Sequence, residues 1–199
     1  NTSDGLCAVA SSLGWRTGDN IVTFESEFPA NYYPWRGLGV EVRYCRGKGG
    51  RYDVEELIDL IDGGRRLVTV TAVQYCSGFR ADLERIGRAA RAFDALLAVD
   101  IIQAFGVSPF DLPAQLVDIA AGSSYKWLCA PEGCGIFYLS ERARDGAGPD
   151  YLDILLDAVI DLGIGLGPPV GDADDIHLGA KLGHDRFGRT RPAEHRRAQ

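Results

Sequence analysis

Two predicted strands of this 199-residue chain are followed by residues that suit carbonyl chemistry. These residues are a lysine, a carboxylate and an amide. Lys126 comes after the small residues 122–124 and before the glycine-containing turn 131–135, and Asp100 and Gln103 follow an apolar run. A lysine amine forms a Schiff base with an aldehyde, and a buried carboxylate keeps a pyridine nitrogen protonated so that the ring accepts electrons. The set therefore indicates an aromatic aldehyde cofactor attached to Lys126, with Asp100 beside its ring nitrogen.

Hydroxyl residues at two further places could hold a phosphate group of the same cofactor. Thr2 and Ser3 begin an apolar helix that we predict to continue through Leu13, and one of the two is expected to be its N-cap. Ser123 precedes the lysine by three residues. Unpaired N–H groups and the helix dipole favour an anion at a helix N-terminus. Thr2, Ser3 and Ser123 are therefore predicted phosphate contacts.

Each of these residues, taken alone, has a simpler explanation. A lysine after a serine-rich turn is ordinarily a solvated loop residue, and Asp100 alone could be an ordinary turn residue at a strand end. Ser3 alone could be only a helix cap, which is compatible with a phosphate contact. The functional interpretation depends on their combination.

The elements that must position these side chains alternate along the chain. We predict strands at 21–24, 40–45, 67–73, 96–99, 118–121 and 135–139, and helices at 2–13, 54–61 and 81–93. The nearly continuous apolar run 67–73 is typical of a strand buried on both faces. Strands separated by helical stretches imply right-handed crossover units and a mostly parallel sheet, so the fold class is α/β.

The predicted sheet brings the candidate residues together. Ligands of open α/β sheets bind at the carboxyl ends of the strands. Asp100 and Gln103 follow the strand 96–99, and Ser123 and Lys126 follow the strand 118–121. We therefore expect all four at one edge of the sheet.

Composition limits the classes of partner. The net charge of −7 and the pI of about 5.0 argue against nucleic acid, which would need a basic face, and favour a small-molecule partner. No apolar run approaches the roughly 18 residues that span a bilayer, so we expect a soluble, cytoplasmic protein with no membrane partner. Its five cysteines form no C-x-x-C pair, so we predict no disulfide framework and no metal site, and expect all five to be buried.

Three sequence blocks resemble the class V aminotransferase family of pyridoxal-phosphate enzymes. This fold-type I group includes cysteine desulfurases, selenocysteine lyases, kynureninases and isopenicillin-N epimerase-like proteins. The blocks are residues 1–5 with Leu13-Gly14-Trp15, then Val99-Asp100-x-x-Gln103-x-x-Gly106, and Ser123-x-x-Lys126-Trp127-Leu128-x-x-Pro131-x-Gly133-x-Gly135. The resemblance implies the large domain of such an enzyme, in which helices cover both faces of a mostly parallel sheet in three layers.

The resemblance also implies roles for the first three residues. It makes Lys126 the Schiff-base lysine of pyridoxal 5'-phosphate and Asp100 the partner of the pyridine nitrogen. Gln103 becomes a hydrogen-bond donor to the phenolic oxygen of the cofactor. Since the matched region contains no histidine, proton transfer at the substrate α-carbon would fall to Lys126.

The remaining cofactor contacts come from other segments. Thr2, Ser3 and Ser123 occupy the positions of phosphate contacts. Tyr125 stands where the family commonly has histidine, and a phenol can donate to a phosphate oxygen. Phe28 falls where the family places a ring on the cofactor face, although a lone phenylalanine is more often a core residue.

Two departures from the family pattern bear on the reaction. Desulfurases have histidine at the stacking position and an asparagine near the cofactor, where this chain has Phe28 and Tyr75. We therefore expect an aminotransferase-like enzyme acting through Lys126 on an amino acid or amine. Transamination, epimerisation and lyase chemistry are not separated by these residues. The alternatives are a desulfurase or selenocysteine lyase, or a non-catalytic fragment that retains only the fold.

The chain contains no methionine, so we expect a fragment of a longer protein. The resemblance covers residues 1–144, which we predict to be the cofactor-binding large domain. Residues 145–199, rich in Gly, Asp, Arg and Pro toward their end, are predicted to be a divergent or out-of-frame tail, with the family's small C-terminal domain missing or unrecognisable. The resemblance further implies a homodimer for the full-length protein.

Overall fold

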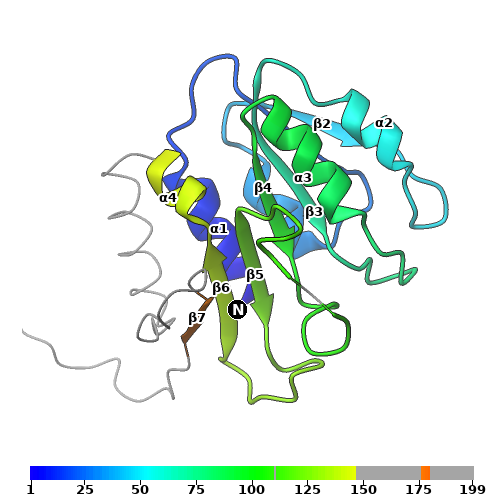
Figure 1. Cartoon of the computed structure of the whole chain (residues 1–199), viewed down its shortest axis with the longest axis vertical. Coiled ribbons are helices and arrows are strands. Elements are labelled where there is room, and N and C mark those ends of the chain that lie inside the picture. The colour runs from blue at the N-terminus through cyan, green and yellow to red at the C-terminus, as the bar shows by residue number, and fades with distance from the viewer. Residues whose placement is uncertain (110, 147–175, 180–199) are drawn as a thin grey trace, which may run out of the picture.

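The computed structural model describes residues 1–109, 111–146 and 176–179, and a seven-stranded sheet forms the centre of this part (Figure 1). The strand order is β2-β1-β3-β4-β5-β6-β7. Strands β1 to β5 pair in parallel with their neighbours, whereas β6 runs antiparallel to both β5 and β7. The strands are β1 Asn20–Phe24, β2 Glu41–Cys45, β3 Arg65–Thr71, β4 Leu96–Asp100, β5 Ile119–Ser123, β6 Gly135–Leu139 and β7 Ile176–Gly179. The predicted mostly parallel α/β sheet is confirmed.

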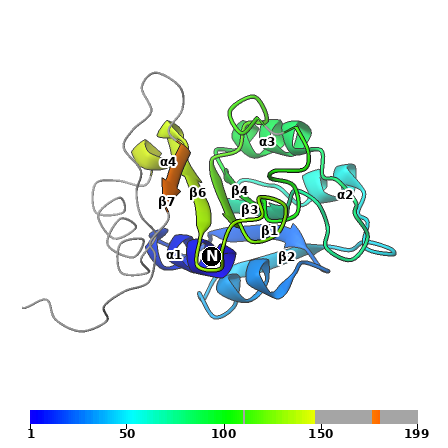
Figure 2. The same cartoon turned by 90° about the horizontal axis from the view of Figure 1, so that it is seen from below.

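Helices cover both faces of this sheet (Figure 2). On one face, α2 (Val54–Asp59) and α3 (Leu83–Ala92) enclose an apolar core with β1, β3 and β4. On the other face, α1 (Thr2–Ser12) packs on β5 and β6, and Trp35 of the short 3-10 helix η2 (Tyr33–Trp35) joins the same core. The three-layer arrangement expected from the family resemblance is therefore present.

The helices begin where side chains satisfy their free N–H groups. Asn1, rather than Thr2 or Ser3, is the N-cap of α1: its side chain accepts from the Asp4 N–H at 3.1 Å, and Asp4 accepts in return from the Asn1 amine. This corrects the predicted cap by one residue. Thr2 is thereby placed in the first turn of the helix, where its own N–H faces the sheet edge.

A glycine brings α1 unusually close to the sheet. A Cβ atom on Gly5 would lie 2.9 Å from the Ala121 Cβ and 3.1 Å from the Phe137 ring, closer than carbon atoms pack. The helix can therefore rest directly on β5 and β6. This contact sets the first turn of α1 beside the carboxyl end of β5.

Several boundaries and elements differ from those expected. β3 begins at Arg65 and ends at Thr71, and the chain turns soon afterwards, where the Gln74 N–H donates to the Phe79 carbonyl at 2.8 Å. The 3-10 helices η1 (Pro29–Asn31) and η2, the helix α4 (Glu141–Gly146) and the strand β7 were not predicted. β7 belongs to the segment 145–199, most of which lies outside the described residues, so the predicted tail stays a prediction. No helix in the described ranges combines the length and apolar character that crossing a membrane requires.

Candidate active site

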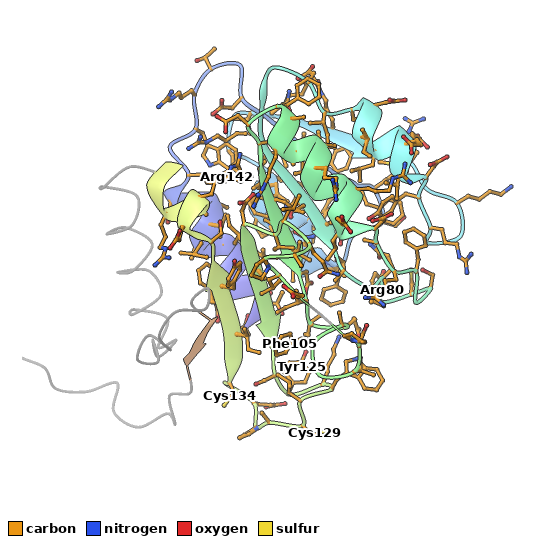
Figure 3. The ribbon with its side chains drawn as sticks, viewed as in Figure 1. Arg80, Phe105, Tyr125, Cys129, Cys134 and Arg142 are labelled. Carbon is orange, nitrogen blue, oxygen red and sulfur yellow. The ribbon has the colours of Figure 1, made fainter. Side chains whose placement is uncertain are left out.

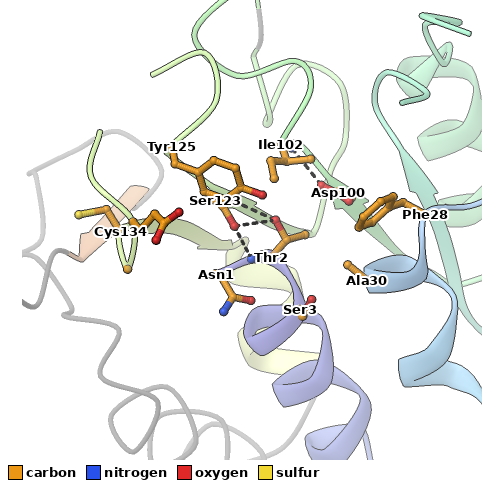
Figure 4. Close-up of a pocket in the computed structure, with 12 residues that line it drawn as sticks. Asn1, Thr2, Ser3, Phe28, Ala30, Asp100, Ile102, Ser123, Tyr125 and Cys134 are labelled. Atoms are coloured by element: carbon orange, nitrogen blue, oxygen red, sulfur yellow. Dashed lines mark hydrogen bonds between the residues drawn. The ribbon is translucent and has the colours of Figure 1, made fainter. Parts of the chain in front are cut away.

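A cavity of about 470 Å³ opens at the carboxyl ends of β4 and β5, beside the first turn of α1 (Figure 4). The turn 132–134 and the segment after β1 complete its walls. Six of the eight predicted site residues line it: Thr2, Ser3, Phe28, Asp100, Ser123 and Tyr125. Tyr125 reaches the cavity from the loop after β5. The parallel sheet thus gathers residues that are up to 123 positions apart in sequence, from Thr2 to Tyr125.

Asp100 is the last residue of β4, and its carboxyl group is buried and incompletely bonded. Its side chain is 1% exposed, Oδ1 accepts from the Ile102 N–H at 2.9 Å, and Oδ2 has no hydrogen-bond partner. Burial raises the pKa of Asp100 to about 6, although the Ile102 hydrogen bond and the positive charge of Lys126 act in the opposite direction. The site therefore contains a carboxylate oxygen that is available to a cationic or N–H group in the cavity.

Lys126 lies half-buried in the loop after β5, close to Asp100 and Phe28. Its Nζ is 6.0 Å from the centre of the Phe28 ring, and its charge lowers the pKa of Asp100. Phe28 is 41% exposed and packs edge-on against Tyr75, with 5.2 Å between the ring centres. One face of an aromatic ring, an amine and a buried carboxyl group are thus brought together.

The hydroxyl groups predicted to bind phosphate form their own network at the end of the cavity (Figure 4). The Thr2 N–H donates to Ser123 Oγ at 3.0 Å, the Ser123 N–H donates to Thr2 Oγ1 at 2.9 Å, and the two hydroxyls lie 3.3 Å apart. Ser3 is exposed in the first turn of α1, and the buried Ser124 Oγ has no partner. The network ties the helix start to the end of β5, and its contact with phosphate stays a prediction.

Gln103 lies at the edge of the site rather than in the cavity wall. It follows β4, and its Oε1 accepts from the Trp127 indole N–H at 3.3 Å. This bond connects the turn after Asp100 with the residue after Lys126. Its Nε2 group is the donor that the predicted contact with a phenolic oxygen requires.

Sequence reasoning missed several residues of this region. Glu27 is buried next to Phe28, and Glu132 and Cys134 line the cavity from the turn after Lys126. Only the glycine pattern around 133 and 135 pointed to that turn. The expectation that all five cysteines are buried was wrong, because a position in a helix or loop does not imply burial: Cys45 is buried, Cys134 is partly buried, and three are exposed, namely Cys7, Cys76 and Cys129.

The family model described as "Aminotransferase class-V" matches residues 1–151. A relative named "Probable cysteine desulfurase" from Methanothermobacter thermautotrophicus is 37% identical over 153 residues, which cover 75% of this chain and 38% of that protein. A cysteine desulfurase from Yersinia pseudotuberculosis is 34% identical over 145 residues, which cover 69% of this chain and 36% of the relative. The chain thus spans less than two fifths of the length of these relatives.

Solved structures show the same architecture. The apo structure of a cysteine desulfurase from Thermococcus onnurineus superimposes with a TM-score of 0.67 at 25% identity, covering 90% of this chain and 44% of that one. An alanine–glyoxylate aminotransferase from Nostoc sp. gives a TM-score of 0.66 at 24% identity, covering 79% and 44%. The second likeness concerns the fold alone.

Proposed function

This chain belongs to the aminotransferase class-V family, whose members depend on pyridoxal phosphate, and from that premise we propose that Lys126 holds this cofactor covalently. We further propose that the protein acts on the amino group or α-carbon of an amino acid or amine. Residues 1–144 would form the cofactor-binding unit.

The unpaired Oδ2 of Asp100 is the observation that carries this proposal. A buried carboxyl oxygen without a partner is costly, and one that also lines a cavity is well placed for a ligand to satisfy it. Asp100 lines a cavity whose opposite wall contains hydroxyl groups and the start of an 11-residue helix. An acceptor on one wall and donors on the other are the partners that a protonated pyridine nitrogen and a phosphate group need.

The other walls also fit a flat, phosphorylated ring. Phe28 offers a ring face on one side, and Tyr125 and Ser123 offer hydroxyl donors at the helix start. Ser3 contributes a free hydroxyl in the first helical turn, where an anion is favoured. Gln103 would donate from beyond Asp100. Glu132 also lines the cavity, and its negative charge would repel a phosphate placed beside it.

When bound, pyridoxal phosphate supplies an electron sink for negative charge developing at a substrate α-carbon. Asp100 would then keep a positive partner in place through its free oxygen. The matched region contains no histidine, so the Lys126 amine is the base that we propose to remove and return the α-proton. Phe28 would exclude water from one side of the bound cofactor.

Reductive trapping tests the proposal on the chain as it stands. Protein mixed with pyridoxal phosphate and reduced with borohydride should carry the cofactor on the peptide containing Lys126. The variant Lys126→Ala should lose the adduct, and Lys48→Ala, which removes an exposed lysine elsewhere, should keep it. Mass spectrometry reads the labelled position. Equal labelling of several lysines would contradict the proposal.

Cysteine desulfurase chemistry is the second candidate, and the names of the relatives favour it. Against it, Phe28 replaces the histidine that the family resemblance expects in desulfurases. Incubating the loaded protein with L-cysteine and a thiol, and measuring sulfide and alanine together, separates the two. Sulfide with alanine would support the second candidate, whereas conversion of a keto acid to an amino acid would support the first.

We also propose a homodimer for the longer protein. Large apolar side chains are exposed beside the site, among them Tyr75 (50%), Trp127 (52%) and Leu128 (38%). Such neighbouring apolar groups are typical of a surface that another chain covers. Sedimentation equilibrium of the longer protein would give the mass of one chain if this part of the proposal is wrong.

A further inference from the structure

Glu27 is a buried carboxyl group for which the proposed chemistry has no use. It lies between β1 and η1, directly before Phe28, and is 6% exposed. Its Oε1 accepts from the Thr71 N–H at 2.8 Å and from Gln74 Nε2 at 3.2 Å, and its Oε2 accepts from the Thr71 hydroxyl. The group thus binds the segment after β1 to the carboxyl end of β3.

Asn31 provides a second anchor on the other side of Phe28. Its Oδ1 accepts from the Thr69 hydroxyl at 2.6 Å, and the side chain is completely buried. Thr69 and Thr71 are two residues apart on β3, so their side chains point to the same face of the sheet. The short segment between Glu27 and Asn31 is therefore fixed to β3 at both ends.

Phe28 itself has few contacts that could hold it. Its ring is 41% exposed, with the Tyr75 ring against its edge and the Lys126 amine 6.0 Å from its centre. The Phe28 carbonyl accepts from the Asn31 N–H at 2.8 Å, so the backbone at this position follows the anchors. The anchored backbone on either side therefore helps to set the place of this partly exposed ring.

We infer that Glu27 is a positioning residue whose hydrogen bonds to Thr71 and Gln74 hold the Phe28 ring against the cofactor cavity. The inference rests on the proposed function, because the ring matters only if an aromatic cofactor lies against it. Glu27 acts through Phe28 and touches no reacting atom. Asn31 supports the same segment from its far end.

The charges around Glu27 favour the protonated form of its carboxyl group as the one that anchors the segment. Thr71 is the register partner of Asp100, so the two carboxyl groups flank neighbouring strand ends. Burial raises the pKa of Glu27 to about 7, the hydrogen bonds from Thr71 oppose this, and the charge of Asp100 raises the pKa further. A neutral Glu27 keeps its acceptor oxygen and gains an O–H, and glutamine offers the same combination of one acceptor and one donor group.

Four variants of the full chain test the inference through their affinity for pyridoxal phosphate and the circular dichroism of the bound cofactor. Loss of a stacked ring should weaken binding about tenfold, so Phe28→Ala and Glu27→Ala should each do so. Glu27→Gln should stay within about twofold of the parent. The double variant Glu27→Ala/Phe28→Ala should bind no more weakly than Phe28→Ala alone, because Glu27 has no ring left to position.

Three results would overturn the inference. Parent-like binding and dichroism in Glu27→Ala would do so, as would losses that multiply in the double variant. If Glu27→Ala does not fold, Thr71→Val removes one anchoring hydroxyl, and an unchanged affinity and cofactor dichroism there would also overturn it. Asp118→Asn, a buried carboxyl group at the other end of the sheet, should leave the affinity unchanged. Absence of any adduct on Lys126 in the parent would instead refute the proposed function.

Discussion

Two buried aspartates at opposite ends of the central strands are bonded very differently. Asp118 precedes β5 at its amino end and is fully buried. Its Oδ2 accepts from the Leu97 N–H at 3.0 Å and from Arg142 at 2.8 Å, and its Oδ1 accepts from Ser140 at 3.1 Å. Arg142 lies at one end of the sheet, and Tyr125 and Cys134 lie at the other (Figure 3). Both oxygens of Asp118 are thus satisfied.

Asp100, at the carboxyl end of β4, has a single hydrogen bond, from the Ile102 N–H. Its second oxygen has no partner, and the Lys126 charge that favours its ionised form does not offset the raising effect of burial on its pKa. A buried charge needs a partner to be stable, so Asp118 contributes to the fold while Asp100 costs folding free energy. The difference supports the proposal that the ligand binds at the carboxyl end of the sheet. Substitution of Asp100 should therefore lower activity but not stability, whereas substitution of Asp118 should lower stability but not cofactor binding.

The largest effect is expected for Asp100→Asn. Removing an electrostatic partner of developing charge typically lowers a rate by about 10²–10³-fold, and we expect a loss of that order in the exchange of amino-acid α-protons with deuterium oxide. The borohydride adduct on Lys126 should still form. Proton NMR of a panel of amino acids with the cofactor-loaded protein measures the exchange.

The same variant separates activity from stability. Because an unpaired buried carboxyl group is replaced by a neutral amide, the free energy of unfolding of Asp100→Asn should equal or exceed that of the parent. Urea denaturation measures it. Parent-like exchange in this variant would remove Asp100 from its assigned role, and a large loss of stability would make the aspartate structural.

Asp118→Ala should behave in the opposite way. It leaves the Leu97 N–H without its acceptor and removes the buried carboxylate partner of Arg142, so we expect the free energy of unfolding to fall by about 3 kcal/mol. Affinity for pyridoxal phosphate should not change. Asp94→Asn is the matched control, because it removes the exposed partner of the same arginine, 3.0 Å away, and should have a much smaller effect.

The carboxyl groups near the cavity should also make stability depend on pH. Asp100 and Glu27 have pKa values of about 6 and 7 in the fold, above their ordinary values of 3.8 and 4.5. The folded protein therefore binds these protons more tightly than the unfolded chain. Their contribution is most favourable below about pH 4 and is lost as pH rises toward 7, by a free energy on the order of 3 kcal/mol for each group.

Urea denaturation of the cofactor-free protein between pH 4.5 and 7.5 tests this expectation. The difference in unfolding free energy between Asp100→Asn/Glu27→Gln and the parent should grow in favour of the variant as pH rises. Curves that stay parallel over this range would show that neither carboxyl group has a raised pKa in the folded protein.

Much of the arrangement at the proposed ligand-binding end could be predicted because it depends on local patterns. β-Branched and apolar runs located the strands, and parallel pairing requires that Asp100 and Lys126 share one edge. The anchoring of Glu27 could not be predicted, because it is a contact with Thr71, 44 residues away, and a glutamate before Phe28 looks like any loop acid. The antiparallel direction of β6 follows because the connection 124–134 contains no helix that could return the chain for parallel pairing, which the pattern of alternation did not reveal.

The prediction of the N-cap of α1 was wrong for a related reason. Asn1, Thr2 and Ser3 are all good caps, and only the reciprocal bonds between Asn1 and Asp4 decide among them. The prediction that all cysteines are buried was wrong because burial was inferred from the apolar character of neighbouring residues. Both errors concern side-chain surroundings, which the chain acquires only after its elements pack.

The smallest predicted effect is on the free energy of unfolding, and it compares two serines at opposite ends of the sheet. Ser123→Ala removes the acceptor of the Thr2 N–H, and Ser140→Ala removes the hydroxyl that bonds Asp118, so each should lower the free energy of unfolding by about 1 kcal/mol. A phosphate at the start of α1 could accept from the released Thr2 N–H, whereas nothing comparable lies at Ser140. Saturating pyridoxal phosphate should therefore reduce the deficit of Ser123→Ala and leave that of Ser140→Ala unchanged. Thermal denaturation of both variants with and without the cofactor measures this, and equal deficits for Ser123→Ala under the two conditions would separate Thr2 and Ser123 from phosphate binding.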